Sequence, residues 1–191
     1  MFKKTLAGLL AGLIAIVSIP TMVQAHIIKN GTDELYYYYG LLPANVQTYL
    51  ENNNVNIIID GNQMQRVVVV GDHNDMIRAE NVGLTKQYID SYGIVRSSAI
   101  YLKEGYESEL LHEVGHVLSN YRGNYNTWAE TAAWKYIYEC EAPYLLMDEY
   151  SKSSPSEYLA ESFSWCIQYP DYMAQKAPMT WQYINAMIER T

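Results

Sequence analysis

Basic side chains are scarce in this chain of 191 residues. It carries 13 lysines and arginines against 21 aspartates and glutamates, a formal net charge of −8 with the histidines neutral. The few basic residues form no cluster. Affinity for nucleic acids comes largely from lysine and arginine side chains that neutralise phosphates, so this composition disfavours a nucleic-acid partner. Neutral or basic peptide partners are compatible with it.

Cysteine is almost absent. Only Cys140 and Cys166 occur, and their spacing is not that of metal ligands. Both fall in segments that the sequence predicts to be helical. A disulfide between them and two buried free thiols are equally compatible with the sequence.

The chain has only one long hydrophobic run, close to its amino terminus. Two lysines precede an apolar stretch at 6–19, and Val23-Gln24-Ala25 has the small residues of a cleavage site. This pattern is typical of a secretory signal peptide, because the run is shorter than the ~20 residues that a membrane-spanning helix needs. We predict a signal peptide at 1–25, a single domain at 26–191, and a secreted, extracellular protein without stable membrane association.

The order of the remaining elements indicates an α+β fold, with strands mostly in the first half and helices in the second. Runs of β-branched residues predict a pair of strands at 55–60 and 66–70 and a short strand at 99–102, while 83–93 reads as a loop or broken helix. Helices are predicted at 43–52, 107–120 and 127–140, from Ser156 to 167, and from Thr180 onward.

The predicted helix at 107–120 contains the pattern His-Glu-x-x-His, formed by His112, Glu113 and His116. Residues four apart lie on one helix face, so two imidazoles can hold one metal ion. Zinc accepts neutral imidazole readily, and catalytic zinc sites use three protein ligands and leave a position for water. We therefore predict one Zn2+ ion, with Glu113 as the general base that takes a proton from the activated water.

A third zinc ligand has to come from elsewhere in the chain. Ser119 and Arg122 stand where a metzincin needs glycine and histidine, and Lys135 stands where a thermolysin-like enzyme needs glutamate. The preferred candidate is Glu157 on the predicted helix that follows Ser156, with Glu130 as the next alternative. A further carboxylate, Glu161, lies one turn after Glu157. It would accept a hydrogen bond from a ligand histidine and fix its tautomer.

These residues carry a family resemblance. His112-Glu113-Val114-Gly115-His116, the later run Glu157-Tyr158-Leu159-Ala160-Glu161-Ser162-Phe163, and Tyr150 seven positions before Glu157 resemble the catalytic domain of anthrax lethal factor and the secreted Pro-Pro endopeptidases. The family has phenylalanines where Tyr158 and Leu159 stand.

The resemblance implies a zincin-like metallopeptidase domain, in which a small mixed sheet packs on an active-site helix ahead of a mainly helical carboxyl-terminal half. It implies zinc ligation by His112, His116 and Glu157, base catalysis by Glu113, and stabilisation of the oxyanion by the hydroxyl of Tyr150. A phenol beside the open metal position can donate to charge that develops in the transition state. Two neighbouring tyrosines, at 144 and 158, are rivals for that role.

The predicted function is that of a secreted zinc-dependent endopeptidase, with a peptide or protein as substrate and, by resemblance, cleavage near prolines. Family folds hold an extended peptide on an edge strand, and we expect this strand at Ser98, Ala99, Ile100 and Tyr101, although a buried core strand is the alternative. Two other functions remain open: a zinc-stabilised binding module or toxin subunit that does not hydrolyse peptides, and a metal-free surface-binding protein.

Overall fold

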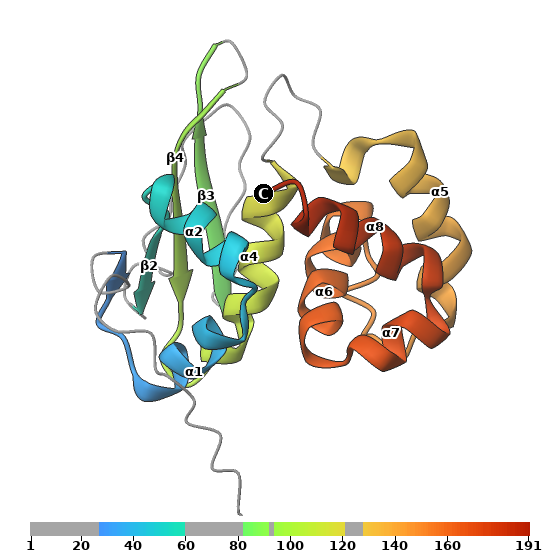
Figure 1. Ribbon diagram of the computed structural model, residues 1–191, viewed down its shortest axis with the longest axis horizontal. Helices are drawn as coiled ribbons and strands as arrows, with labels where there is room; N and C mark the ends of the chain where they lie inside the picture. The colour runs from blue at the N-terminus through green and yellow to red at the C-terminus, as the bar shows by residue number, and fades with distance from the viewer. Residues whose placement is uncertain (1–26, 60–81, 92–93, 121–127) are drawn as a thin grey trace, which may run out of the picture.

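The computed structural model describes residues 27–59, 82–91, 94–120 and 128–191. Within them, a small sheet built from the first half of the chain lies on one side of helix α4 (Leu110–Ser119), and a group of helices from the second half lies on the other side (Figure 1). The α+β architecture expected from the sequence is confirmed. The predicted signal peptide, the predicted strand at 66–70 and the predicted start of a helix at 127 lie outside the described residues.

The sheet is mixed and has the strand order β1-β2-β4-β3. Strand β1 pairs parallel with β2, β2 pairs parallel with β4, and β3 pairs antiparallel with β4. The strands are β1 (Ile28–Lys29), β2 (Asn56–Ile59), β3 (Gly83–Ile89) and β4 (Val95–Leu102).

Two predictions about the strands are wrong. Residues 83–89 form strand β3 rather than a loop or broken helix. The predicted edge strand at Ser98, Ala99, Ile100 and Tyr101 belongs to β4, which lies inside the sheet between β2 and β3. From Ala99 to Leu102, β4 is paired on both sides, so its main chain is not free to bind a peptide. Of the two strands at the edges of the described sheet, β1 and β3, it is β3 that lies next to α4.

The helices are α1 (Asp33–Leu41), α2 (Ala44–Asn52), α4 (Leu110–Ser119), α5 (Ala132–Glu141), α6 (Pro155–Gln168), α7 (Pro170–Lys176) and α8 (Pro178–Ile188). Four predicted starts move by a few residues, and the last of them, that of α8, lies at Pro178 rather than at Thr180. A 3₁₀ turn, η2 (Glu107–Glu109), precedes α4, and the capping residues of α5 and α6 are Thr131 and Ser154, each of which accepts a backbone N–H of the first turn.

Two helices, α1 and α7, are absent from the sequence prediction. Helix α1 carries the tyrosine run at 36–39, which lacks strong helix formers. Its start is nevertheless encoded, because Thr32 caps the helix and Asp33 and Glu34 occupy the first turn, where carboxylates are favourable. Within the run, Tyr39 is fully buried and Tyr37 is exposed.

Helix α4 is the central element of the core. Nine of its ten residues are buried, because the sheet covers one side of the helix and α6 the other. A helix that is apolar around most of its circumference is stable only when it is enclosed in this way. Cys140 and Cys166 are free thiols, and no helix in the described ranges is long and apolar enough to cross a membrane.

Helices α4 and α6 are in close backbone contact at Gly115. A Cβ atom at this position would lie 2.7 Å from Cα and 2.9 Å from the carbonyl oxygen of Ala160. Both atoms belong to the backbone of α6, so they cannot move aside without displacing the helix. Glycine lowers the helix propensity of α4, but only glycine allows this separation between the two helices.

Replacement of Gly115 by alanine is therefore expected to lower the free energy of unfolding by about 1–3 kcal/mol through overpacking. Gly40, in helix α1, provides the matched control, because a Cβ there meets nothing within 4 Å. The variant Gly40→Ala is expected to be as stable as the wild type or slightly more stable. Denaturant unfolding followed by tryptophan fluorescence, with a chelator present, measures both. An unchanged midpoint for Gly115→Ala would contradict the close contact.

Candidate active site

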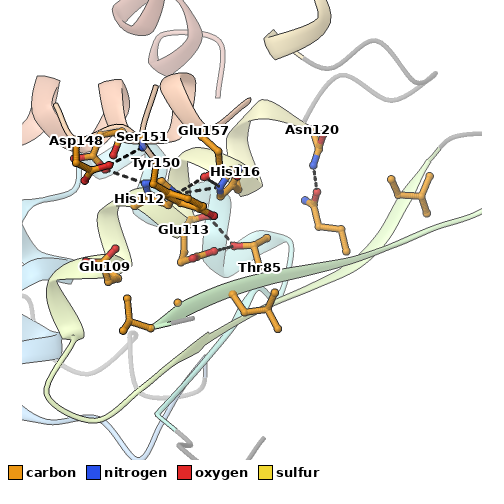
Figure 2. Close-up of a pocket in the computed structure, with 16 residues that line it drawn as sticks. Thr85, Glu109, His112, Glu113, His116, Asn120, Asp148, Tyr150, Ser151 and Glu157 are labelled. Atoms are coloured by element: carbon orange, nitrogen blue, oxygen red, sulfur yellow. Dashed lines mark hydrogen bonds and ion pairs between the residues drawn. The ribbon is translucent and has the colours of Figure 1, made fainter. Parts of the chain in front are cut away.

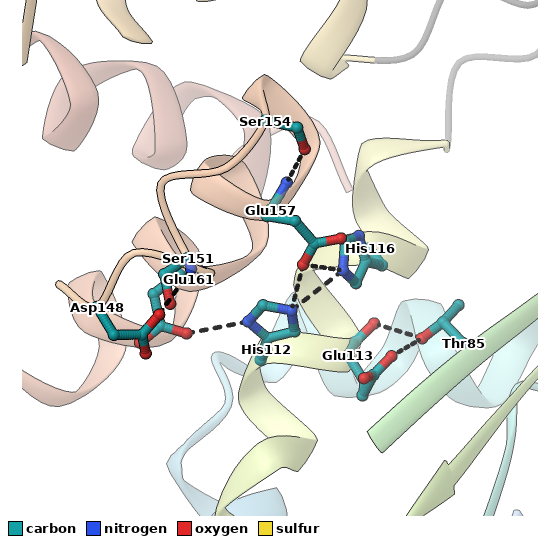
Figure 3. Close-up of polar contacts among 9 residues, drawn as sticks. All are labelled: Thr85, His112, Glu113, His116, Asp148, Ser151, Ser154, Glu157 and Glu161. Atoms are coloured by element: carbon teal, nitrogen blue, oxygen red, sulfur yellow. Dashed lines mark hydrogen bonds and ion pairs between the residues drawn. The ribbon is translucent and has the colours of Figure 1, made fainter. Parts of the chain in front are cut away.

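Three side chains from two helices converge on one point beside α4. His112 and His116 lie one turn apart on α4, and Glu157 comes from the first turn of α6 (Figure 3). The Nε2 atoms of the two histidines are 3.1 Å apart, and Oε2 of Glu157 is 3.2 Å from Nε2 of His112 and 3.4 Å from Nε2 of His116. No other group of three His, Cys, Asp or Glu side chains within the described residues is arranged to hold a metal ion.

The separations within this cluster fit a zinc ion. A tetrahedral zinc site with bonds of about 2.0–2.1 Å has ligand atoms about 3.3 Å apart, and the three measured separations lie close to that value. Two imidazole nitrogens and one carboxylate oxygen are also a donor set that zinc accepts, and they occupy three of the four tetrahedral positions. The predicted ligands His112, His116 and Glu157 are thus brought together.

The local sequence explains how Glu157 reaches the cluster. Helix α6 begins with Pro155, whose fixed φ suits the first helical position, and the Ser154 hydroxyl accepts the backbone N–H of Glu157 at 3.2 Å. The carboxylate of Glu157 therefore projects from the first turn, where the helix dipole favours negative charge. The glycine contact with Ala160, one turn further along α6, brings this part of the helix against α4.

A chain of hydrogen bonds supports His112 on the side away from the cluster. Nδ1 of His112 lies 2.9 Å from Oε2 of Glu161, and the indole N–H of Trp165 donates to Oε1 of Glu161 at 2.6 Å. A proton on Nδ1 leaves Nε2 free to bind a metal. Glu161 thus lies against the histidine that the sequence predicts as a ligand, whereas the contact with Trp165 was not predicted.

The charges around the cluster favour a cation. Burial opposes protonation of His112, but its hydrogen bonds to Glu157 and Glu161 outweigh this effect and raise the pKa of His112 to about 10. Burial alone would raise the pKa of Glu157, but the hydrogen bonds from His112 and His116 hold it far below its ordinary value. A positive charge at this point is therefore strongly stabilised, and a metal ion can supply it in place of a proton.

Glu113 lies on α4 between the two histidines and points toward strand β3 (Figure 3). Its Oε2 atom accepts a hydrogen bond from the hydroxyl of Thr85 at 2.7 Å, and its side chain is buried. Burial raises the pKa of Glu113, while the charge of His116 and the hydrogen bond from Thr85 act in the opposite direction. A carboxylate with a raised pKa is a stronger base than an exposed glutamate.

The cluster opens into a cavity of about 780 Å³ between β3, α4 and the segment that precedes α6 (Figure 2). The side chain of Tyr150 lines this cavity and is drawn close to His112 and Glu113 in Figure 2, with part of its surface exposed. Burial raises the pKa of Tyr150 to about 12, and the carboxylates of Glu157 and Glu113 act in the same direction. Its hydroxyl therefore stays protonated and able to donate. The cavity is lined by Val82, Gly83, Leu84, Thr85, Gln87, Ile89, Glu109, His112, Glu113, His116, Asn120, Asp148, Tyr150, Ser151, Glu157 and Glu161.

The segment that carries Tyr150 is held by short hydrogen bonds. A side-chain oxygen of Asp148 accepts the backbone N–H of Ser151 at 2.7 Å, and the carbonyl of Tyr150 accepts the N–H of Ser153 at 2.9 Å. The hydroxyl of Tyr138, on α5, donates to the carbonyl of Lys152 at 2.6 Å. These contacts fix the backbone on both sides of the tyrosine.

The alternatives from the sequence do not reach the cavity. Tyr144 is exposed away from it, and Tyr158 is buried with its hydroxyl 2.8 Å from that of Thr180. Glu130 is exposed and forms an ion pair with Lys135 at 2.7 Å. The proposed peptide-binding residues at 98–101 do not line the cavity either.

The residues that the sequence reasoning missed come mainly from β3. Gly83, Thr85 and Gln87 alternate along the strand and face α4, so this face of β3 is small and polar rather than apolar. Alternation of apolar and polar residues is the usual signal of a half-buried strand, and a strand that borders a polar cavity does not show it. The remaining indication of a strand was the presence of residues with high β propensity at positions 85, 88 and 89.

Comparison with known proteins supports the family resemblance. Residues 42–187 match the family described as "Anthrax toxin lethal factor, N- and C-terminal domain". The fold is similar to the solved structure of the Pro-Pro endopeptidase PPEP-2 from Paenibacillus alvei, with a TM-score of 0.54 and 17% sequence identity over 84% of this chain and 96% of that one. No curated protein sequence matches. The family match spans well over half of the chain and includes α4 and α6, the helices that carry His112, His116 and Glu157. This protein therefore belongs to the anthrax toxin lethal factor family.

Proposed function

We propose that this protein is a secreted zinc metalloendopeptidase that hydrolyses an extended peptide in the cavity beside α4. The observation that carries this proposal is the convergence of His112, His116 and Glu157 at near-tetrahedral separations, with Glu113 and Tyr150 facing the same cavity. The signal-like segment at 1–25 supports export.

In this mechanism the two histidines and Glu157 would hold the ion, and Glu161 would fix the orientation of His112. A bound zinc ion supplies Lewis-acid chemistry, which lowers the pKa of water and polarises a carbonyl group. Glu113 accepts the proton of the attacking water while the oxygen adds to the scissile carbonyl carbon. It then delivers a proton to the amide nitrogen as the C–N bond breaks. The hydroxyl of Tyr150 donates to the carbonyl oxygen as negative charge develops on it.

Strand β3 is the element best placed to bind the substrate backbone. It is the terminal strand of the described sheet and borders the cavity along most of its length. An extended peptide that pairs with such an edge gains main-chain hydrogen bonds without regard to its side chains. This role replaces the one expected for residues 98–101. Cleavage near prolines is proposed from the family and from the name of PPEP-2.

Replacement of Glu113 by glutamine is expected to lower the rate of peptide cleavage about 10²- to 10⁴-fold, because the amide cannot act as a base. The control is Glu139→Gln, which changes an exposed glutamate on α5 and should leave cleavage intact. Mass spectrometry of a peptide library that includes consecutive prolines measures both. Undiminished cleavage by Glu113→Gln would falsify the mechanism. A wild-type protein that binds zinc but cleaves no peptide would favour the non-hydrolytic binding module.

Zinc content provides an independent test. Elemental analysis after dialysis is expected to find one zinc ion per wild-type chain and substoichiometric zinc in Glu157→Gln, because the amide is a weaker ligand than the carboxylate. Glu130→Gln, which changes the alternative ligand, should retain the metal. Loss of zinc from Glu130→Gln and not from Glu157→Gln would reverse the ligand assignment. A wild-type chain that takes up no metal would support the metal-free alternative.

The role of Tyr150 predicts a change in turnover rather than in binding. Tyr150→Phe is expected to lower kcat about 10²- to 10³-fold, the usual effect of removing one oxyanion donor. Its KM and zinc content should change little. Tyr144→Phe removes the hydroxyl of an exposed tyrosine outside the cavity and should behave as the wild type in steady-state kinetics. Equal kcat values for the two variants would exclude Tyr150 as the donor.

A further inference from the structure

Strand β3 encloses the carboxylate of Glu113 with two residues that lie two positions apart. Side chains at i and i+2 of a strand point to the same face, and at positions 83 and 85 this face is turned toward α4. The hydroxyl of Thr85 lies 2.7 Å from Oε2 of Glu113 and 3.0 Å from its backbone carbonyl oxygen. Both of these atoms are acceptors, so the single hydroxyl proton of Thr85 is directed at Glu113 and is closest to the carboxylate.

Gly83 limits the other side of the carboxylate. A Cβ atom at this position would lie 2.5 Å from Oε1 and 3.0 Å from Cγ of Glu113. The observed orientation of the carboxylate is therefore compatible only with glycine at position 83. Together, the hydrogen bond at Oε2 and the close approach at Oε1 select one orientation of the side chain.

Further contacts hold β3 in register with α4. The side chain of Gln87 donates to the carbonyl of Val117 at 3.5 Å and to the hydroxyl of Ser98 at 3.2 Å, and it accepts a hydrogen bond from the side chain of Asn120. Val117 lies one helical turn after Glu113, and Gln87 lies two residues after Thr85. Successive contacts on the strand therefore match successive turns of the helix. The strand thus follows the helix over about one turn, and the hydroxyl of Thr85 stays opposite Glu113.

We propose that Thr85 is a positioning residue that orients the Glu113 carboxylate for proton transfer, and that Gly83 provides the space in which the oriented carboxylate lies. This inference rests on the proposed function, because orientation matters only if Glu113 acts as a base. General-base catalysis depends on the direction of the carboxylate, and a displacement of about 1 Å can cost about 10²-fold in rate. A threonine that served only to attach β3 to α4 would affect stability and not the orientation of Glu113.

The test compares Thr85→Val, which removes the hydroxyl and keeps the shape, with Thr85→Ser, which keeps the hydroxyl. Thr85→Val is expected to lower kcat about 10- to 100-fold and to change KM less than about twofold, with zinc content retained. Thr85→Ser should recover most of the lost turnover. The matched control is Thr48→Val. Thr48 donates to a helix carbonyl on the exposed side of α2, and it does not line the cavity. This variant should have wild-type kinetics.

Crystal structures of the wild type, Thr85→Val and Gly83→Ala provide a second readout that does not require activity. The Glu113 carboxylate is expected to leave its position in both variants, since one lacks the hydrogen bond and the other lacks the space. An unchanged carboxylate in Thr85→Val, or a loss of turnover in Thr85→Ser as large as in Thr85→Val, would overturn the positioning role. If the wild type cleaves no peptide, the proposed function fails, and the carboxylate position in these structures still decides the role of Thr85.

Discussion

The close contact between Gly115 of α4 and the backbone of Ala160 on α6 is the constraint on which the site depends. His112 lies three residues before Gly115, and Glu157 lies three residues before Ala160, so on each helix the proposed metal ligand and the contact share one face. The separation of the helices at the contact therefore sets the separation of the ligand atoms. A wider spacing would leave the two histidines paired with each other but without their carboxylate, whose distances to them are 3.2 and 3.4 Å.

The same contact joins two parts of the protein with different tasks. Helix α4 is covered on one side by the sheet, which supplies the hydroxyl of Thr85 to Glu113, and on the other side by α6, which supplies Glu157 and Glu161. Each histidine thus receives its carboxylate partners from α6, while Glu113 receives its partner from the sheet. This division keeps the carboxylate of Glu113, the proposed base, apart from that of Glu157, the proposed metal ligand.

The convergence of the site residues could be predicted from the sequence, because the patterns that indicate it are local. His112, Glu113 and His116 are specified by helical spacing, and Glu157 and Glu161 by the same spacing on a second helix. The pairing of the strands could not be predicted in the same way. Which strand is at the edge depends on contacts distant in sequence, such as that of β2 with β4, and the polar inner face of β3 hides its periodicity. The tyrosine run of α1 was missed because its helix depends on burial of Tyr39 and on the Thr32 cap more than on propensity.

The enclosure of α4 also bears on how proteins of this kind can diversify. Nine of its ten residues are buried, and the tenth, His116, is a proposed metal ligand. Almost every substitution in this helix would therefore disturb the packing or remove a proposed ligand. Strand β3, which is mostly half-buried, and the exposed stretch from Asp148 to Tyr150 both border the cavity. New preferences for peptide sequence would therefore arise by variation in these two borders, while the helix between them stays constant.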